Sequence, residues 1–127
     1  MSHITRKQIL DTADIQLYVY ADDLKANTYE GQAEVCWGLR NALMVPTRIW
    51  NCATPQAQFK DCDFERHKAE IDEHIEVIRQ YVALHPHYTV VIFPKIGRGC
   101  SNMKLLAPRC YAYLLTQLRK FDPTYET

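Results

Sequence analysis

Residues 88–93 form a continuous, largely apolar run between two segments with helical periodicity, and this arrangement restricts the fold more than any other feature. A run of this length is typical of a strand that is covered on both faces. The preceding segment, about residues 63–84, has the pattern of a helix, and Pro86 ends it because residues before proline avoid the α region. The inner face of this helix carries Ile71, Ile75, Ile78 and Val82, which recur at helical spacing. A second helix is predicted at about residues 106–120, so the sequence indicates an α/β fold, a sheet with helices packed on its faces.

Shorter elements complete the predicted order. Residues 1–14 are expected to form an N-terminal arm or a short helix. Residues 15–20 are rich in β-branched and aromatic side chains and are predicted to be a strand. A short helix at about residues 32–37 follows a glycine, and a short strand at residues 43–45 ends at a proline. Because no internal repeat divides the chain, residues 15–127 are predicted to form a single domain.

The composition fits one domain with its own apolar core. The chain has 127 residues, of which 47% are hydrophobic, and its formal net charge is zero. Zero net charge argues against a surface for duplex nucleic acid, which is usually basic. It also leaves little long-range repulsion between copies, so the sequence is compatible with a homodimer.

Cysteine usage and hydropathy indicate a cytoplasmic protein. The five cysteines include no CxxC pair, so neither a disulfide framework nor a structural zinc site is predicted. No apolar h-region follows the N-terminus, and no apolar run approaches the roughly 20 residues of a membrane span. We therefore expect a protein of the reducing cytoplasm that uses no metal, no cofactor and no membrane partner.

The strongest candidate for a functional site is the glycine loop at residues 96–102, which follows the predicted strand at residues 88–93. Glycines permit positive φ and let backbone N–H groups approach a ligand closely, and successive N–H groups can form a concave nest for anions. An arginine between them would add a planar donor group matched to phosphate. The alternative is a turn that needs glycine only for its backbone shape. The candidate ligand-binding residues of this loop are Gly97, Arg98, Gly99, Cys100, Ser101 and Asn102.

Polar residues near the other predicted strands form a second group of candidates. Asp22 and Asn27 follow the first strand, where they would accept from an adenine amine or a ribose hydroxyl, or would merely form a solvated turn. Asn41 and Thr47 flank the second strand and would contact a sugar or hold loop backbone. Because ligands in such sheets bind outside the carboxyl ends of strands, we expect the loops to converge on one crevice.

Histidine and thiol chemistry is not indicated by the sequence. Cys100 lies in the glycine loop, where a nearby helix N-terminus would favour a reactive thiolate, but no histidine is suitably spaced to activate it, so an unreactive thiol is the preferred interpretation. Four of the five histidines, His67, His74, His85 and His87, show no metal-ligand spacing and are interpreted as structural or surface residues.

Several segments in fixed order resemble a family of small macro-domain-like proteins found in bacteria and their phages. Residues 17–24 are similar to the first strand and turn of that family, and residues 31–33 to its small-residue loop. Residues 38–48 resemble its "GLxNAxxIPTK" segment. Residues 93–100 resemble its strand and "IGxGLAG" loop, and residues 107–108 resemble the start of its last helix.

The resemblance covers about residues 15–120 and implies a three-layer macro-domain-like fold, with a mixed sheet flanked by helices. It also implies a pocket for ADP-ribose or a related nucleotide at the strand carboxyl ends. The chain departs from the family pattern at Asp23, where asparagine is usual, and at Arg98 and Cys100, which replace small or apolar residues. By position, the pocket would be lined by Asp22, Asn27, Gly31, Asn41, Thr47, Gly97, Arg98, Gly99 and Cys100.

These residues are compatible with functions of different classes. The leading hypothesis is a module that binds ADP-ribose or a related NAD-derived or cyclic nucleotide. In a phage, such a module would sequester or degrade a host immune nucleotide signal in the host cytoplasm. An enzyme of the same fold would instead hydrolyse an ADP-ribosyl linkage, with Asp22, Asn27 and Asn41 as its catalytic candidates. A protein-interaction module would present an aromatic surface built from Trp37, Trp50, Tyr111 and Tyr113.

Overall fold

The computed structural model describes residues 3–26, 31–52, 54–98 and 101–125, and its centre is a three-stranded sheet. Its strands are β1 (Gln16–Asp23), β2 (Ala42–Arg48) and β3 (Thr89–Ile92), in the order β2-β1-β3. Both pairings are parallel. Within the described residues the sheet is therefore parallel and not mixed as expected, because each crossover returns the chain to the same end of the sheet before the next strand begins.

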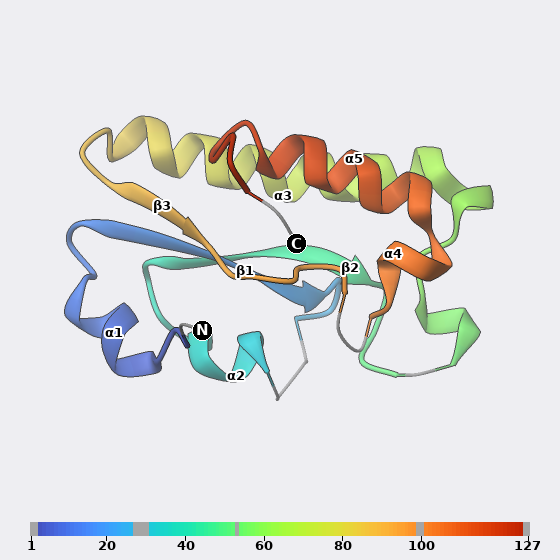
Figure 1. The fold of residues 1–127 in the computed structure, drawn as a ribbon, viewed down its shortest axis with the longest axis horizontal. Helices are drawn as coiled ribbons and strands as arrows, with labels where there is room; N and C mark the ends of the chain where they lie inside the picture. Colours follow the sequence, from blue (N-terminus) through green and yellow to red (C-terminus); the bar gives the residue numbers. More distant parts are fainter. Residues whose placement is uncertain (1–2, 27–30, 53, 99–100, 126–127) are drawn as a thin grey trace.

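Helices cover both faces of this sheet (Figure 1). The helices α1 (Arg6–Asp11) and α2 (Gln32–Cys36) lie on one face, and α3 (Phe64–Leu84) and α5 (Pro108–Leu118) lie on the other. Right-handed crossovers explain this distribution, since the β1–β2 and β2–β3 connections run in opposite directions across the sheet. The short helices in the connections are η1 (Pro55–Ala57), η2 (Asp61–Asp63) and α4 (Met103–Leu106).

The predicted elements are found, but β1 and β2 run further toward the carboxyl edge than expected. The strand expected at residues 43–45 continues through Pro46 to Arg48. The alternation of the backbone hydrogen bonds explains why the strand can continue through a proline. Tyr18 N–H donates to Asn41 O at 2.8 Å, so the odd-numbered residues of β2 form the hydrogen bonds to β1 and the even-numbered residues do not. The ring nitrogen of Pro46 therefore points to the outer edge of the sheet, where a proline costs no ladder hydrogen bond.

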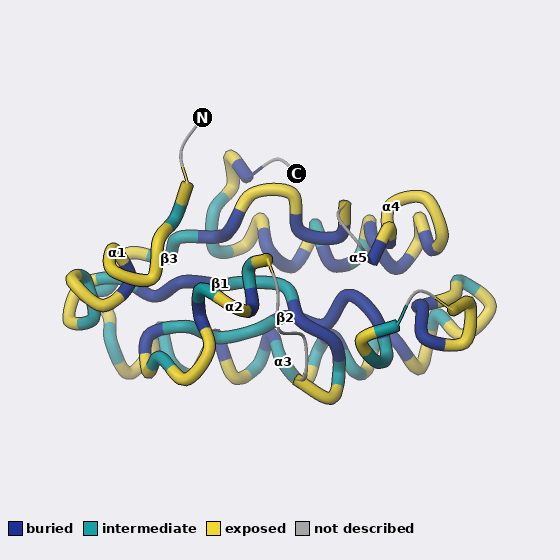
Figure 2. The backbone as a smooth tube through the Cα atoms, turned by 90° about the horizontal axis from the view of Figure 1, so that it is seen from below, coloured by how far each residue is buried: buried dark blue, intermediate teal, exposed yellow. Residues whose placement is uncertain are grey.

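The apolar core lies mainly between the sheet and the pair formed by α3 and α5, and Figure 2 shows β1 buried along most of its length between its neighbours. The helical periodicity correctly predicts the inner face of α3, since Ile71, Ile75 and Ile78 are buried. Burial of each such side chain contributes roughly 1.5–3 kcal/mol. None of the helices in the described part of the chain is both long and apolar enough to cross a membrane.

The strand β3 is less enclosed than its sequence suggests. In the described part of the chain it lies at one edge of the sheet and pairs with β1 alone. Thr89 is exposed, Val90 and Val91 are half-buried, and only Ile92 is buried. Its apolar run therefore reflects packing between helical layers without a neighbouring strand on the outer side.

The N-terminus of α5 is capped by a carboxylate from a distant part of the chain. Asp61, in η2, accepts hydrogen bonds from the backbone N–H groups of Arg109 and Cys110, both at 3.0 Å. Burial raises the pKa of Asp61, but these N–H groups outweigh it and hold the pKa below its ordinary value of 3.8. The bonds satisfy donors that the first turn of a helix leaves unpaired, and they connect the β2–α3 connection to α5.

We predict that Asp61→Ala lowers the free energy of unfolding by about 1 kcal/mol at pH 7, the usual cost of losing a helix cap. Because the folded-state pKa of Asp61 is lowered, its contribution is present above pH 3.8 and is lost as the pH falls through the folded-state value. Urea denaturation of both proteins at several pH values measures the difference. Asp63→Ala is the matched control, since Asp63 makes no side-chain cap bond, and an equal loss in that variant would contradict the assignment.

Candidate functional site

The ladder between β1 and β3 breaks at the carboxyl edge of the sheet. Phe93 N–H still donates to Val19 O at 2.9 Å, and by alternation the next bond would run from Ala21 N–H to Phe93 O. Instead Ala21 N–H donates to Oε1 of Gln32 at 2.9 Å, and Phe93 O accepts from the hydroxyl of Tyr125 at 2.6 Å. The two strands therefore separate here, and side chains satisfy the backbone groups that the separation exposes.

Gln32 spans the resulting crevice. Its Oε1 accepts from β1, and its Nε2 donates to Pro94 O in the segment that leaves β3, at 2.9 Å. The chain leaves β1 toward α2 on one face of the sheet and leaves β3 toward α4 and α5 on the other (Figure 1). Such a switch point is where ligands of parallel α/β sheets usually bind.

The glycine turn after β3 is held rigidly by the helix behind it. Gly97 has φ +82°, and a Cβ at this position would lie 2.9 Å from Cδ1 of Tyr111. The carbonyl of Gly97 accepts from Lys104 N–H at 3.0 Å, and Lys95 O accepts from Arg98 N–H at 3.1 Å. Glycine is therefore required here both for the positive φ and for the close approach to α5.

Backbone strain is concentrated in the loops of this same edge. Within the described ranges the non-glycine residues with positive φ are Ala26 (52°), Lys95 (60°) and Asn102 (46°). Ala26 follows β1, Lys95 follows β3, and Asn102 immediately precedes α4. Left-handed conformations of such residues are unfavourable and persist where the surroundings impose them, which happens often at ligand sites.

A pair of adjacent carboxylates ends β1. Asp22 and Asp23 are 5% and 0% exposed. The Oδ1 atom of Asp22 accepts from Asp23 N–H at 2.7 Å, and the Oδ1 atom of Asp23 accepts from Lys25 N–H at 2.8 Å. On the face of β1 that carries Asp22, the pKa of Tyr20 is raised to about 12 by burial, by the charge of Asp22 and by Cys36. Tyr20 therefore stays a neutral donor beside a buried carboxylate.

The end of β2 contributes a polar group on the other side of the aspartates. Thr47 and Arg48 are buried, and Arg48 is the register partner of Asp23. The carbonyl of Arg48 accepts from Leu24 N–H at 3.0 Å. Its Nη2 donates to Oδ1 of Asn51 at 2.6 Å. The guanidinium-bearing residue Arg48 thus lies on the strand next to Asp23, at the carboxyl edge of the sheet.

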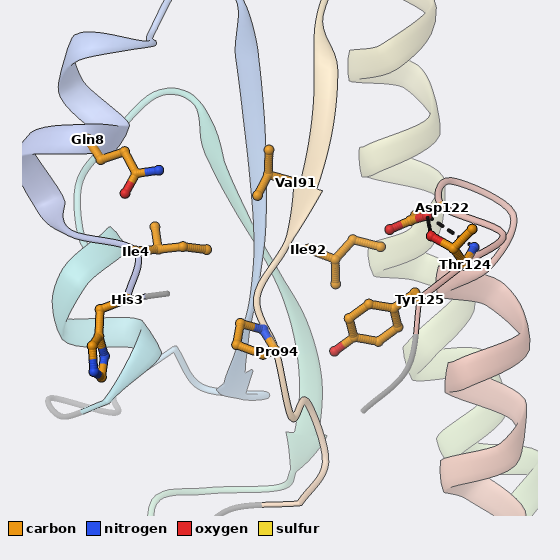
Figure 3. Close-up of a pocket in the computed structure, with 9 residues that line it drawn as sticks. All are labelled: His3, Ile4, Gln8, Val91, Ile92, Pro94, Asp122, Thr124 and Tyr125. Carbon is orange, nitrogen blue, oxygen red and sulfur yellow. Dashed lines mark hydrogen bonds between the residues drawn. The ribbon is translucent and has the colours of Figure 1, made fainter. Parts of the chain in front are cut away.

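A groove runs along β3 and reaches this crevice. Figure 3 shows its wider part, of about 400 Å³, between the N-terminal residues His3 and Ile4 on one side and Tyr125 on the other. A second part of about 290 Å³ shares His3, Ile4 and Pro94 and continues to Gly31 and Gln32. Apolar side chains of Val35 and Phe93 line this second part. A ligand at the carboxyl edge therefore has an apolar recess beside it.

The structure gathers most of the described candidate residues at one edge of the sheet, on the loops and strand ends just described. Asn27, Gly99 and Cys100 lie outside the described residues. The candidates at the edge are Asp22, Gly31, Thr47, Gly97, Arg98, Ser101 and Asn102.

Asn41 is the candidate that the structure places elsewhere. It precedes β2, at the opposite end of the sheet, and its Nδ2 donates to Ile9 O at 3.0 Å and to Gln16 O at 3.1 Å. Its side chain is buried and fastens α1 to the start of β1. Asn41 is therefore not part of the crevice, and neither a ligand-binding nor a catalytic role there fits its position.

Sequence reasoning missed Gln32 and Arg48 as site residues. The role of Gln32 depends on two backbone segments that are distant in sequence, so no local pattern announces it. Arg48 had a weaker but usable signal, since a basic residue lies shortly after the apolar run at residues 43–45, at the end where such sheets bind ligands.

Three of the four aromatic residues considered for an interaction surface, Trp37, Tyr111 and Tyr113, do not form one patch. Trp37 is exposed at the end of α2, on one face of the sheet, whereas Tyr111 and Tyr113 belong to α5 on the other face (Figure 1). Tyr111 is buried, and the hydroxyl of Tyr113 donates to Asp72 of α3. These tyrosines therefore pack between helices instead of facing a partner.

His67 and the thiols of Cys36 and Cys110 are held by burial and by their neighbours. His67 is buried and stacks on Phe59, with Nδ1 at 2.8 Å from Oε1 of Glu70. Burial raises the pKa of Cys36 and Cys110 to about 12, so both thiols stay protonated at neutral pH. Within the described ranges, no group of three or more His, Cys, Asp or Glu side chains is placed to hold a metal ion.

These features define a small α/β protein with a three-stranded parallel sheet and a recess beside its carboxyl edge, at Gln32, Phe93 and Pro94. Residues 1–117 match the model of the Family of unknown function (DUF7831), and the chain belongs to that family. No curated protein matches the chain, and no solved structure does. The family match lends no support to the macro-domain-like resemblance.

We predict that Gly97→Ala destabilises the fold more than Gly38→Ala. Both glycines have positive φ, +82° and +75°, but a Cβ at Gly38 would meet nothing within 4 Å, whereas one at Gly97 would press on Tyr111. The Gly38 variant should lose about 1–2 kcal/mol from backbone strain alone. The Gly97 variant should lose a further 1–3 kcal/mol, roughly, from overpacking. Urea denaturation measures the free energy of unfolding of both variants. Equal losses would contradict the prediction, because they would show that the turn and Tyr111 can move apart without loss of stability.

Proposed function

We propose that this protein binds a nucleotide of the ADP-ribose type, or a related NAD-derived or cyclic nucleotide, at the carboxyl edge of its sheet. The observation that carries the proposal is the separation of β1 and β3 directly above the Gly97 turn, because this creates a crevice at the switch point of a parallel sheet. The macro-domain-like resemblance, with a three-layer fold of that kind, is part of the same proposal and names the ligand class.

The phosphates would lie at the loop between β3 and α4. The turn at Gly97 is packed against Tyr111 of α5, which fixes its course, and Arg98 is exposed on the same turn. Guanidinium groups pair with phosphate oxygens through parallel N–H donors. Ser101 and Asn102 add neutral polar groups next to it.

The sugar and base would lie on the α2 side of the crevice. Asp22 supplies a carboxylate acceptor for ribose hydroxyls or a base amine, and Gln32 supplies an amide beside it. The recess of about 290 Å³ that begins at Gly31 and Gln32 has apolar walls, which suits the flat face of a nucleobase. Polar groups at the floor and apolar walls beside them are the usual composition of a nucleotide site.

We predict that one compound of a panel containing ADP-ribose, NAD, cyclic ADP-ribose and cyclic dinucleotides raises the melting temperature. A ligand present at about 100 times its dissociation constant adds roughly 2.7 kcal/mol of stability. Arg98→Ala should lose most of this shift, because it removes the phosphate contact. Arg79→Ala is the control, since Arg79 is an exposed arginine paired with Glu76 on α3.

The absence of any shift across the panel, or an equal loss in both arginine variants, would contradict the proposal. Product analysis of the compound that binds then separates binding from hydrolysis. If that compound is cleaved, Asp22→Ala should abolish turnover while part of the thermal shift remains from the phosphate contacts, which would assign the enzyme of the same fold. If no compound is cleaved, the protein is a binding module.

A further inference from the structure

The outer edge of β3 carries backbone groups that pair with no other strand in the described part of the chain. Thr89 N–H donates to Ile15 O of the β1 side at 2.9 Å, so the odd-numbered residues of β3 form the hydrogen bonds to β1. By alternation, the N–H and C=O groups of Val90 and Ile92 point away from β1. The edge therefore offers two donors and two acceptors at the spacing of an extended backbone.

This edge lacks the features that usually protect an edge strand from pairing, which are a lysine, a proline or a β-bulge. All four residues of Thr89–Ile92 are uncharged and β-branched, and their register with β1 is regular. Such side chains favour the extended conformation. Pro94 follows the strand and has no N–H, so the row of outward donors ends there. The edge is therefore suited to receive one more strand over a short length.

The same edge is the floor of the groove of about 400 Å³ that Figure 3 shows. Val91, Ile92 and Pro94 lie along this floor, Ile4 lies on one wall and Tyr125 lies on the other. The N-terminal segment forms the wall on the face of α1 and α2, and the C-terminal segment forms the wall on the face of α3 and α5 (Figure 1). Figure 2 shows both segments extending past β3 on the side away from β1. A groove of this form suits a single extended backbone.

A second copy of the chain does not suit this groove. The strand has four residues and spans roughly 13 Å, whereas stable protein interfaces bury about 1,200–2,000 Å² in total. If two such edges approached each other, the walls that extend past β3 would meet before the strands did. The edge is thus too short and too recessed for a dimer, and a peptide is the occupant that it fits.

The groove also favours one charge on its occupant. Asp122 is the only Asp, Glu, Lys or Arg among the described residues that line it. Its Oδ1 accepts from the N–H and the hydroxyl of Thr124, at 3.1 Å and 2.8 Å. Its Oδ2 takes part in no hydrogen bond or salt bridge within the described ranges. A lysine or arginine of the peptide would pair with this oxygen.

We propose that β3 binds an extended peptide segment of a partner protein by strand addition, with β-branched side chains between the walls and a basic side chain on Asp122. Backbone hydrogen bonds to Val90 and Ile92 supply the affinity, and the side chains supply the specificity. The inference goes beyond the proposed function and is independent of it, because the nucleotide would lie at the Gly97 loop and in the recess at Gln32.

The test selects peptides from a displayed library of random heptapeptides on the full chain and measures the affinity of an enriched peptide by fluorescence anisotropy. We expect the enriched peptides to combine β-branched residues with a lysine or arginine. Each backbone amide of one such peptide is then N-methylated in turn, which removes one donor at a time. Strand addition uses the donors of every second residue, so the loss of affinity should alternate along the peptide, with roughly tenfold losses at the facing positions.

Variants of the protein test the same contacts from the other side. Val90→Pro removes an outward N–H without removing a hydrogen bond to β1, and it should weaken peptide binding roughly tenfold. Val90→Ala is its matched control, since it keeps the N–H and should bind nearly as tightly as the unaltered protein. Asp122→Asn should weaken binding about threefold and reduce its dependence on salt. Glu76→Gln, which changes a carboxylate paired with Arg79 on α3, should change neither.

The inference is overturned if no peptide is enriched, if N-methylation lowers the affinity without alternation, or if Val90→Pro binds as tightly as Val90→Ala. A dimer in sedimentation that Val90→Pro dissociates would also overturn it, because a second copy would then occupy the edge. Should Val90→Pro fail to fold, the N-methylation pattern decides. Alternating peptide binding without any response to the nucleotide panel would support this inference and refute the proposed nucleotide alone.

Discussion

The separation of β1 from β3 is the constraint on which the rest of the site depends. A parallel ladder cannot simply stop in the interior, because each interrupted pair leaves a donor and an acceptor without partners. Gln32 satisfies the donor of Ala21, and Tyr125 satisfies the acceptor of Phe93. One of these side chains comes from the layer of α1 and α2, and the other follows α5 on the opposite face. The crevice is therefore supported from both helical layers at once.

The same arrangement explains why strain collects at this edge. Once the strands part, each exit loop must turn sharply toward its own layer, and the positive-φ residues Ala26, Lys95 and Asn102 lie in those turns. The rigid body behind them is α5, whose own first turn is anchored by Asp61. Tyr111 of that helix fits against Gly97 so closely that no other side chain would be accommodated at the glycine. The packing of α5 thus stabilises loops at the carboxyl edge whose backbone conformations are unfavourable by themselves.

Much of the fold could be predicted from the sequence because it follows from periodicity. The spacing of Ile71, Ile75 and Ile78 defines the inner face of α3, and Pro86 fixes its end. What could not be predicted depends on pairing between distant segments: the extension of β2 through Pro46, and the all-parallel order of the strands. The mixed sheet was expected from a resemblance, and nothing in the local pattern could correct it.

The candidate site divides in the same way. The turn at Gly97 could be predicted from the sequence, because glycines that follow an apolar strand usually mark a turn with positive φ. Asn41 was misplaced because a polar residue next to a strand gives no sign of which end of the sheet it occupies.

Gln32 also offers a way to compare members of the family. Its amide must present an oxygen to one strand and a nitrogen to the other, over a span that a shorter asparagine would not bridge. A glutamate has the length but lacks the donor. The residue at this position is therefore a marker in its own right. In relatives that carry glutamine here, we expect the same pair of hydrogen bonds between the ends of β1 and β3. In relatives with another residue, either the two strands continue their ladder, or a different side chain satisfies the same backbone groups.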